Sequence, residues 1–103
     1  MNAEAAFADI SVRLLGEPGV DEGTGFGKNP GLRVGGKIFA MIVRGDLVMK
    51  LPADVCSALV ESGRATYFVV GKKEMREWVN AGGEPADDWP ALVTQALEFV
   101  CQA

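Results

Sequence analysis

The segment from Gly31 to Pro52 constrains the fold of this chain more than any other. It reads GLRVGGKIFAMIVRGDLVMKLP, in which apolar runs are separated by Gly35-Gly36 and Gly45-Asp46. Two-residue loops of this kind between β-branched runs are typical of tight hairpins, because glycine adopts positive φ without steric cost. We therefore predict three short strands joined by two turns. Pro52 is expected to begin a helix, where its missing N–H does no harm.

Pairing the strands through both turns places apolar residues on both faces of the sheet. One face collects Ile38, Ala40, Ile42, Leu47, Met49 and Leu51, and the other collects Leu32, Val34, Phe39, Met41, Val43 and Val48. An antiparallel sheet usually keeps one polar face. Leaving the second set in water would forfeit about 1.5–3 kcal/mol for each large side chain. We therefore expect either loops or a second subunit to cover it, and we favour a homodimer, the commonest soluble oligomer, with this second set as the candidate dimer face.

The remaining periodicity predicts an α+β fold of two layers, with an antiparallel sheet and helices in the order α-β-β-β-α-β-β-α. Helices are expected over residues 3–15, from Pro52 to Gly63, and from Asp87 or Asp88 onward, where an aspartate would serve as N-cap. Two further strands are expected over residues 66–70 and 75–79, and one extra short strand near residues 24–28.

Length and composition indicate one globular domain over residues 1–103. The chain is 49% apolar and 23% charged, which is ordinary for a folded protein. No run approaches the roughly 18 apolar residues of a membrane span. The acidic N-terminal stretch lacks the basic start of a secretory signal. We therefore expect a cytoplasmic protein with no membrane association.

The side chains that most often carry catalysis are scarce. The chain has no histidine, which removes the commonest general acid–base group near neutral pH. Cys56 and Cys101 have no CxxC partner, so we expect both to be reduced core residues. Trp78 is expected in the core, with stacking on a base or ligand as the alternative. We predict no catalytic residue, no cofactor and no metal site.

Positive charge is concentrated in the predicted sheet, although the formal net charge is −4. Such asymmetry is a weak indication of an anionic partner, and solubility and packing against acidic helices are the alternative explanation. The candidate anionic-partner surface consists of Lys28, Arg33, Lys37, Lys50, Lys72, Lys73 and Arg76.

The segment GLRVGGKIFAMIVRGDLVMKLP, followed by GK..MREWV and DW..L...AL.FV, resembles the family of small TfoX N-terminal-domain proteins, which is related to the MmcQ/YjbR proteins. The resemblance covers nearly the whole chain from Phe7. Family members often have Met-Phe-Gly where this chain has Gly25-Phe26-Gly27, and Asp-Pro where it has Val69-Val70. The resemblance implies a secretion-chaperone-like α+β fold and two functions: regulation of competence, and DNA binding through wing-like hairpins. It implies no catalytic residues.

Two hypotheses about function follow. The first is a non-enzymatic interaction or regulatory module that acts as a homodimer, or binds another protein. The second is a DNA-binding protein that uses the basic hairpins, in which case affinity should fall steeply with salt. The acidic composition, with a pI near 4.7, disfavours the second.

Overall fold

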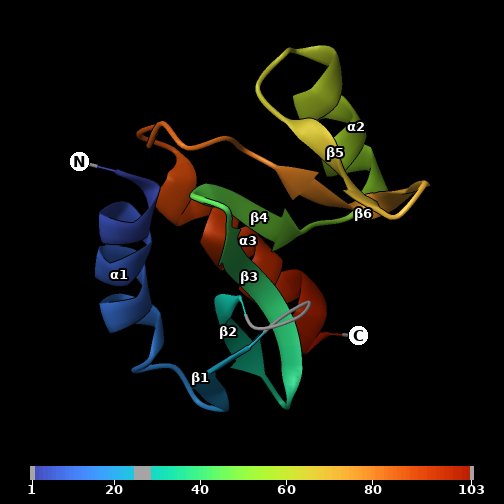
Figure 1. Ribbon diagram of the computed structural model, residues 1–103. Helices are drawn as coiled ribbons and strands as arrows, with labels where there is room; N and C mark the ends of the chain where they lie inside the picture. Colours follow the sequence, from blue (N-terminus) through green and yellow to red (C-terminus); the bar gives the residue numbers. More distant parts are fainter. Residues whose placement is uncertain (1, 25–28, 103) are drawn as a thin grey trace.

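The computed structural model describes residues 2–24 and 29–102, which form three helices and six strands (Figure 1). The elements in chain order are α1 (Ala3–Leu14), β1 (Val20–Thr24), β2 (Pro30–Val34), β3 (Lys37–Val43), β4 (Asp46–Lys50), α2 (Ala53–Glu61), β5 (Thr66–Val70), β6 (Lys73–Asn80) and α3 (Trp89–Cys101). This confirms the predicted α+β fold. The extra strand is β1, which lies slightly earlier in the chain than predicted.

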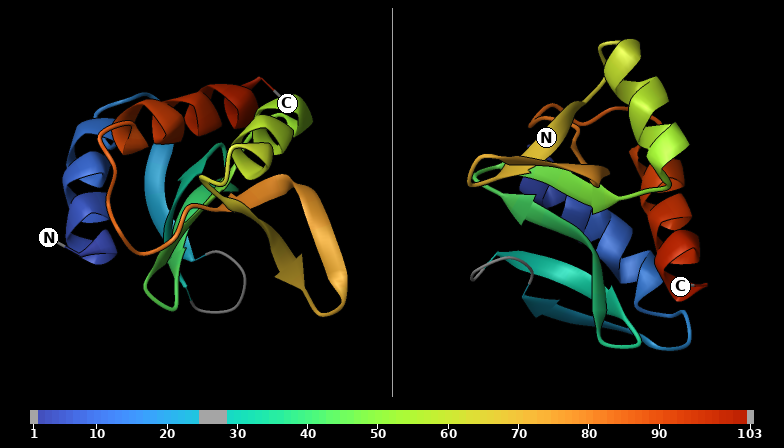
Figure 2. Two further views of the ribbon diagram at one scale, coloured as in Figure 1. Left: turned by 90° about the horizontal axis from the view of Figure 1, so that it is seen from above. Right: turned by 90° about the vertical axis from the view of Figure 1, so that its right-hand side faces the viewer.

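The strands form one antiparallel sheet in the order β1-β2-β3-β4-β6-β5. All three helices lie on one side of it, as the view from above shows (Figure 2, left). Helix α3 packs on β3 and β4, α2 on β6 and β5, and α1 on β4 and β3. The predicted two-layer architecture is therefore correct, and β1 and β5 are the two edges of the sheet.

Both predicted hairpin turns are present, and one is displaced by a residue. Gly35 and Gly36 have φ of 58° and 81°, as the predicted turn requires. In the second turn the residues with positive φ are Arg44 (52°) and Gly45 (82°), so Asp46 begins β4 and is not part of the turn. Arg44 therefore occupies a left-handed conformation that asparagine or glycine adopts more readily.

The main hydrophobic core lies between the sheet and the helices. Phe7 and Ile10 of α1 and Val93 of α3 meet the helix-facing residues of β2, β3 and β4 there. Several of the sheet residues in this core are completely buried: Phe39, Ala40, Leu47 and Met49 are 0% exposed. Burial of this kind is the dominant favourable term in folding.

A β-bulge makes the predicted division of the two faces wrong for four residues. The pairing passes from Leu32 with Ala40 to Arg33 with Ile38, so Phe39 has no opposite residue. Phe39 and Ala40 consequently both face the helices, and the alternation of β3 is reversed before them. Of the candidate dimer face, Leu32, Val34 and Phe39 belong to the main core beneath the helices. Ile38 moves the other way, to the helix-free face.

The helix-free face carries a smaller cluster that the chain itself buries. Met41, Val48 and Trp78 are 0%, 0% and 5% exposed, with partly buried neighbours on three strands. Those neighbours are Ile38, Val43, Phe68 and Met75. Phe68 and Met75 of the β5–β6 hairpin reach this cluster, and the register of the hairpin shifts between Tyr67 and Phe68. Five of the six residues of the candidate dimer face are therefore buried within one chain, and only Val43 is partly exposed.

The predicted helix ends are largely correct, although one cap works differently. Gly63 follows α2 with φ of 78°, as expected for a residue that ends a helix. Asp88 occupies the N-cap position of α3, but its side chain makes no capping hydrogen bond and pairs with Arg64. The prediction for the cysteines is correct for Cys56, which is buried, and wrong for Cys101, which is exposed at the last turn of α3.

Candidate functional site

Six of the seven basic residues of the candidate anionic-partner surface lie in the described part of the chain, and those six do not form one surface. Lys28 lies outside the described residues. Arg33 on β2 pairs with Asp21 on β1, with 2.8 Å between Nη2 and Oδ2. Lys37 follows the β2–β3 turn, which points away from the β5–β6 turn in each view (Figures 1 and 2). Arg33 and Lys37 are therefore separated from the basic residues of the β5–β6 hairpin.

The other four basic residues lie close together, on or beside the β5–β6 arm, the name used here for Thr66–Asn80. Lys72 is in the turn of the arm, and Lys73 begins β6. Lys50, Lys73 and Arg76 line a shallow cleft of about 480 Å³ together with Met75 and Trp78. We call this the β6 cleft. Figure 2 (left) shows the arm projecting beyond the rest of the sheet.

The β6 cleft forms where β4 leaves the sheet. Lys50 is the last residue of β4 and lies opposite Trp78 of β6. The Leu51 N–H then donates to the Glu77 carbonyl at 3.0 Å, after which the chain enters α2. The part of β6 before Glu77 is paired with β5 alone among the described strands, so the cleft borders an open stretch of strand edge.

The charge of the β6 cleft is mixed. Glu74 and Glu77 also line it, and Arg76 Nη2 lies 3.6 Å from Glu74 Oε1. The guanidinium of Arg76 also stacks over the Tyr67 ring, with its central carbon 4.9 Å from the ring centroid. Such a contact contributes about 0.5–1 kcal/mol at an exposed site. Glu74 thus partly neutralises the charge of Arg76, and the contact with Tyr67 holds its side chain in place. Lys50 and Lys73 are therefore the main positive charges of the cleft.

The free edge of β5 is the most apolar exposed feature of the sheet. The strand reads TYFVV and contains no charged residue. Val69 and Val70 are 51% and 43% exposed, and β5 pairs with β6 on one side only. Native proteins usually protect such an edge with charges, bulges or proline, because an unprotected edge pairs readily with another strand.

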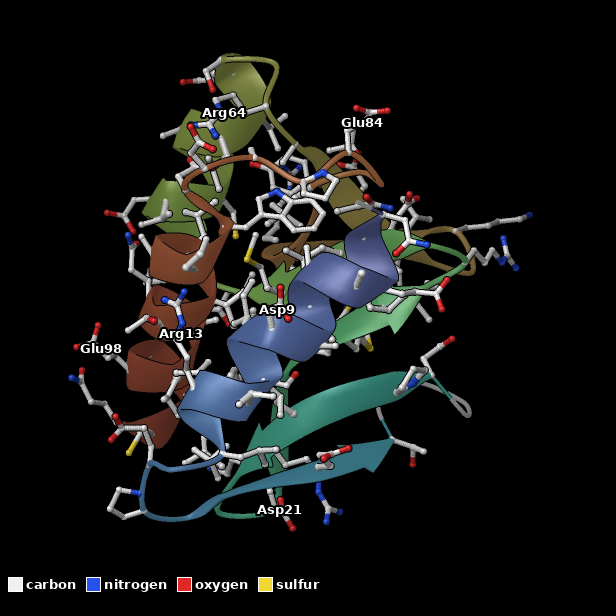
Figure 3. All side chains as sticks on the ribbon, turned by 90° about the vertical axis from the view of Figure 1, so that its left-hand side faces the viewer. Asp9, Arg13, Asp21, Arg64, Glu84 and Glu98 are labelled. Carbon is white, nitrogen blue, oxygen red and sulfur yellow. The ribbon has the colours of Figure 1, made fainter. Side chains whose placement is uncertain are left out.

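The two ends of β5 differ in charge. At its start, Thr66 lies opposite Asn80, whose Nδ2 donates to Asp46 Oδ2 at 3.1 Å. Arg64, just before the strand, is paired with Asp88. Figure 3 shows Arg64 and Glu84 in the same part of the molecule, and Asp21 at the opposite end. At the other end of β5 lie Lys72 and Lys73, so the start of the strand has a balanced ion pair and its end is basic.

Cys56 is buried, and the described acidic side chains do not cluster as metal ligands do. Cys56 Sγ lies 3.4 Å from the Leu51 carbonyl oxygen, and burial raises the pKa of its thiol. A raised pKa keeps the thiol protonated and unreactive. Within residues 2–24 and 29–102, no three His, Cys, Asp or Glu side chains lie close enough to hold a metal ion. None of the helices in that part of the chain is long and apolar enough to cross a membrane.

The strand β5 was predicted from the sequence, but its position at the edge of the sheet was not. Its position at the end of the sheet depends on β6 being inserted between β4 and β5, a pairing between segments far apart in sequence. The lack of charge in TYFVV was the one available signal.

The comparisons with known proteins identify one family. The YjbR family model matches residues 15–98, which is most of the chain. The search of curated proteins found no significant match. The search of solved structures likewise found none. The chain therefore belongs to the YjbR family, and the TfoX N-terminal domains that it also resembles form a related family.

Proposed function

We propose that this member of the YjbR family is a non-enzymatic interaction module, which recognises other polypeptide chains by adding a strand to its β5 edge. The observation that carries the proposal is the uncharged strand β5, which pairs with β6 alone among the described strands and exposes Val69 and Val70. In strand addition, main-chain hydrogen bonds supply affinity and alternate side chains supply specificity. A non-enzymatic role is also supported by the absence of histidine from the sequence and by the buried, protonated thiol of Cys56.

A peptide that copies residues 64–73, RATYFVVGKK, provides a direct test, because its three basic residues keep it soluble. Added to the isotopically labelled protein, it should shift the amide resonances of Thr66–Val70 and leave those of β1 unchanged. The control peptide has proline in place of its central Val69, which removes an N–H from the ladder and should abolish the shifts. Equal shifts from both peptides, or none from either at millimolar concentration, would exclude strand addition.

The basic part of the arm supports nucleic-acid binding as a second candidate. Lys50 and Lys73 flank a cleft that Trp78 also lines, and Lys72 is adjacent. Cations beside an aromatic side chain are the elements that proteins use to hold single strands. Fluorescence anisotropy with a labelled oligonucleotide should then show an affinity that falls steeply between 50 and 200 mM salt.

The variants Lys73→Glu and Lys37→Glu separate this candidate from non-specific attraction, since both make the same charge change. Lys73 lines the β6 cleft and Lys37 lies by the distant β2–β3 turn. Binding at the cleft predicts that Lys73→Glu weakens affinity about tenfold or more and that Lys37→Glu has a much smaller effect. An affinity that does not depend on salt, or that both variants reduce equally, would reject the candidate.

A further inference from the structure

We infer that the strand added to β5 is β5 of a second copy of this chain, paired antiparallel about a twofold axis. This inference rests on the proposed function, since it names the partner for the same edge. The two copies would then share one continuous sheet of twelve strands, six from each chain. Each copy would use the same surface, as an isologous twofold interface requires.

The first argument is the charge along β5. In an antiparallel pair, the end of one strand lies beside the start of the other. Lys72 and Lys73 of one copy would thus lie beside the start of β5 in the other, where Asp88 balances the charge of Arg64. The strand itself contains no charge, so no like charges oppose one another within it. A parallel pairing would instead place the lysines of both copies together.

The second argument is the position of the apolar side chains. Phe68 is the central residue of β5, so pairing all five residues places it opposite its counterpart at the axis. Tyr67 then lies opposite Val69 of the second copy, and Thr66 opposite Val70. Val69 and Val70, both about half exposed in the single chain, would each gain a cross-strand neighbour. Aromatic and β-branched pairs of this kind are among the most stabilising in antiparallel sheets.

The opposite edge of the sheet does not offer the same contact. β1 reads VDEGT, and its central residue is Glu22. Self-pairing of β1 about its centre would place Glu22 opposite Glu22, with Asp21 next to it. Like charges directly opposite one another destabilise a strand pair. The contrast selects the β5 edge for self-association and predicts a closed dimer.

The interface is small, so the expected affinity is weak. A pair of five-residue strands falls below the size of standard stable interfaces, and we expect a dissociation constant on the order of 10–100 µM. Sedimentation equilibrium of the wild-type chain from about 10 to 500 µM should therefore show a monomer–dimer equilibrium.

The decisive comparison uses two exposed valines. Val69→Lys places a charge on the β5 edge, whereas Val12→Lys makes the same change on α1, where Val12 is 76% exposed. The dissociation constant should rise at least tenfold for Val69→Lys and stay within twofold of wild type for Val12→Lys. Val70→Lys is a second edge variant, should Val69→Lys lose its native circular-dichroism spectrum. A wild-type chain that is monomeric at 500 µM, or equal effects of the edge and helix variants, would overturn the inference.

A spin label on Lys72→Cys, in a Cys101→Ser background, tests the geometry. With Phe68 on the axis, the Val70 residues of the two copies are four strand positions apart, and each Lys72 lies two residues further on in the turn. The two labelled residues should therefore be about 20–27 Å apart at up to 3.4 Å per residue. A distance distribution centred within this range supports the pairing, and one centred far outside it overturns the pairing. If the peptide of residues 64–73 binds the β5 edge while the wild-type chain stays monomeric, strand addition survives and the second-copy partner is rejected.

Discussion

The two edge strands of this sheet, β1 and β5, have the same length of five residues and opposite chemistry. β1 contains Asp21, Glu22 and Gly23, and Asp21 is held by Arg33 of the neighbouring strand. β5 has three consecutive aromatic or valine positions after Tyr67 and no charge at all. One edge thus has the charges and glycine that discourage strand pairing, and the other has the residues that favour it.

The difference shows that each edge of a sheet is protected from strand pairing by its own residues. In this sheet the β1 edge has that protection and the β5 edge lacks it. The apolar character of the central strands does not expose a surface, because the helices bury one face and the β5–β6 arm contributes to burying the other. The exposed valines of the sheet, Val69 and Val70, are at the β5 edge. If the protein recognises other chains, the edge is therefore a better candidate than the face of the sheet.

The strongest test of this comparison gives β1 the character of β5. Replacing Asp21 with Thr and Glu22 with Val should produce a molecule in which both edge strands can pair with another chain. Pairing at both edges cannot close as a dimer, so we expect open polymers in place of a limited equilibrium. Light scattering and sedimentation velocity at about 100 µM would detect them as a continuous series of larger species.

The control for this variant removes the same two charges elsewhere. Asp9 on α1 and Glu98 on α3 are exposed on helices, as Figure 3 shows. Asp9→Thr with Glu98→Val should leave the assembly state unchanged. If both double variants polymerise alike, loss of net charge would explain the result, and the edge comparison would fail.

The β1 side of the sheet also depends on a close approach of backbones that β5 does not have. A Cβ atom on Gly31 would lie 2.6 Å from both the Ala40 carbonyl oxygen and Ile38 Cδ1. This crowding occurs beside the β-bulge of β3. We expect Gly31→Ala to lower the free energy of unfolding by about 2–4 kcal/mol, as overpacking against backbone does. Urea denaturation followed by circular dichroism measures the change.

Gly16→Ala is the matched control, because its Cβ would lie at an ordinary 3.5 Å from the nearest atom, the Arg13 carbonyl oxygen. Its effect should be within about 0.5 kcal/mol of zero. A Gly31→Ala variant as stable as Gly16→Ala would mean that β2 and β3 can move apart without loss, and that this close approach does not fix the β1 side of the sheet.

Breaking the ion pair near either edge should lower the free energy of unfolding by a smaller amount, and the two losses should differ slightly. Asp21 and Arg33 are 57% and 37% exposed at the side chain, and Asp88 and Arg64 are 35% and 47% exposed. Because the Asp88 pair is the less solvated, Asp88→Asn should reduce stability by about 0.5–1 kcal/mol and Asp21→Asn by less. Both losses should shrink in 1 M NaCl, where surface charges are screened. Losses unaffected by salt would point to packing or hydrogen bonding as their cause.

The sequence was informative about the elements and much less so about their arrangement. The turn at Gly35-Gly36 and the strand at 66–70 were predicted correctly because their signals are local. The face of Phe39 was predicted wrongly, because a bulge reverses the alternation and nothing in the segment marks it. The edge position of β5 and the convergence of Lys50 with Lys73 depend on β4 pairing with β6, which lies beyond the reach of periodicity.

The smallest expected change in the free energy of unfolding comes from the ionisation of Cys56. This residue lies on α2, the helix packed against β5 and β6. Burial raises the pKa of its thiol in the folded state. Its contribution to stability is therefore complete below the pKa of the unfolded thiol, about 8.5, and is lost as pH rises toward the folded value. We expect the free energy of unfolding to fall by less than about 1 kcal/mol between pH 7.5 and 9.0, measured by urea denaturation in reducing buffer.

Cys56→Ala should be less stable at both pH values, because it leaves a cavity, but it should lose this part of the pH dependence. Cys101→Ser should keep the wild-type dependence, because Cys101 is exposed. Thiol labelling at pH 8 provides the corresponding kinetic measurement: Cys101 should react at once and Cys56 only as the structure around α2 opens. Rapid labelling of both thiols in the native protein would mean that the β5 side of the sheet opens easily, and would weaken the case for a preformed edge that another strand can join.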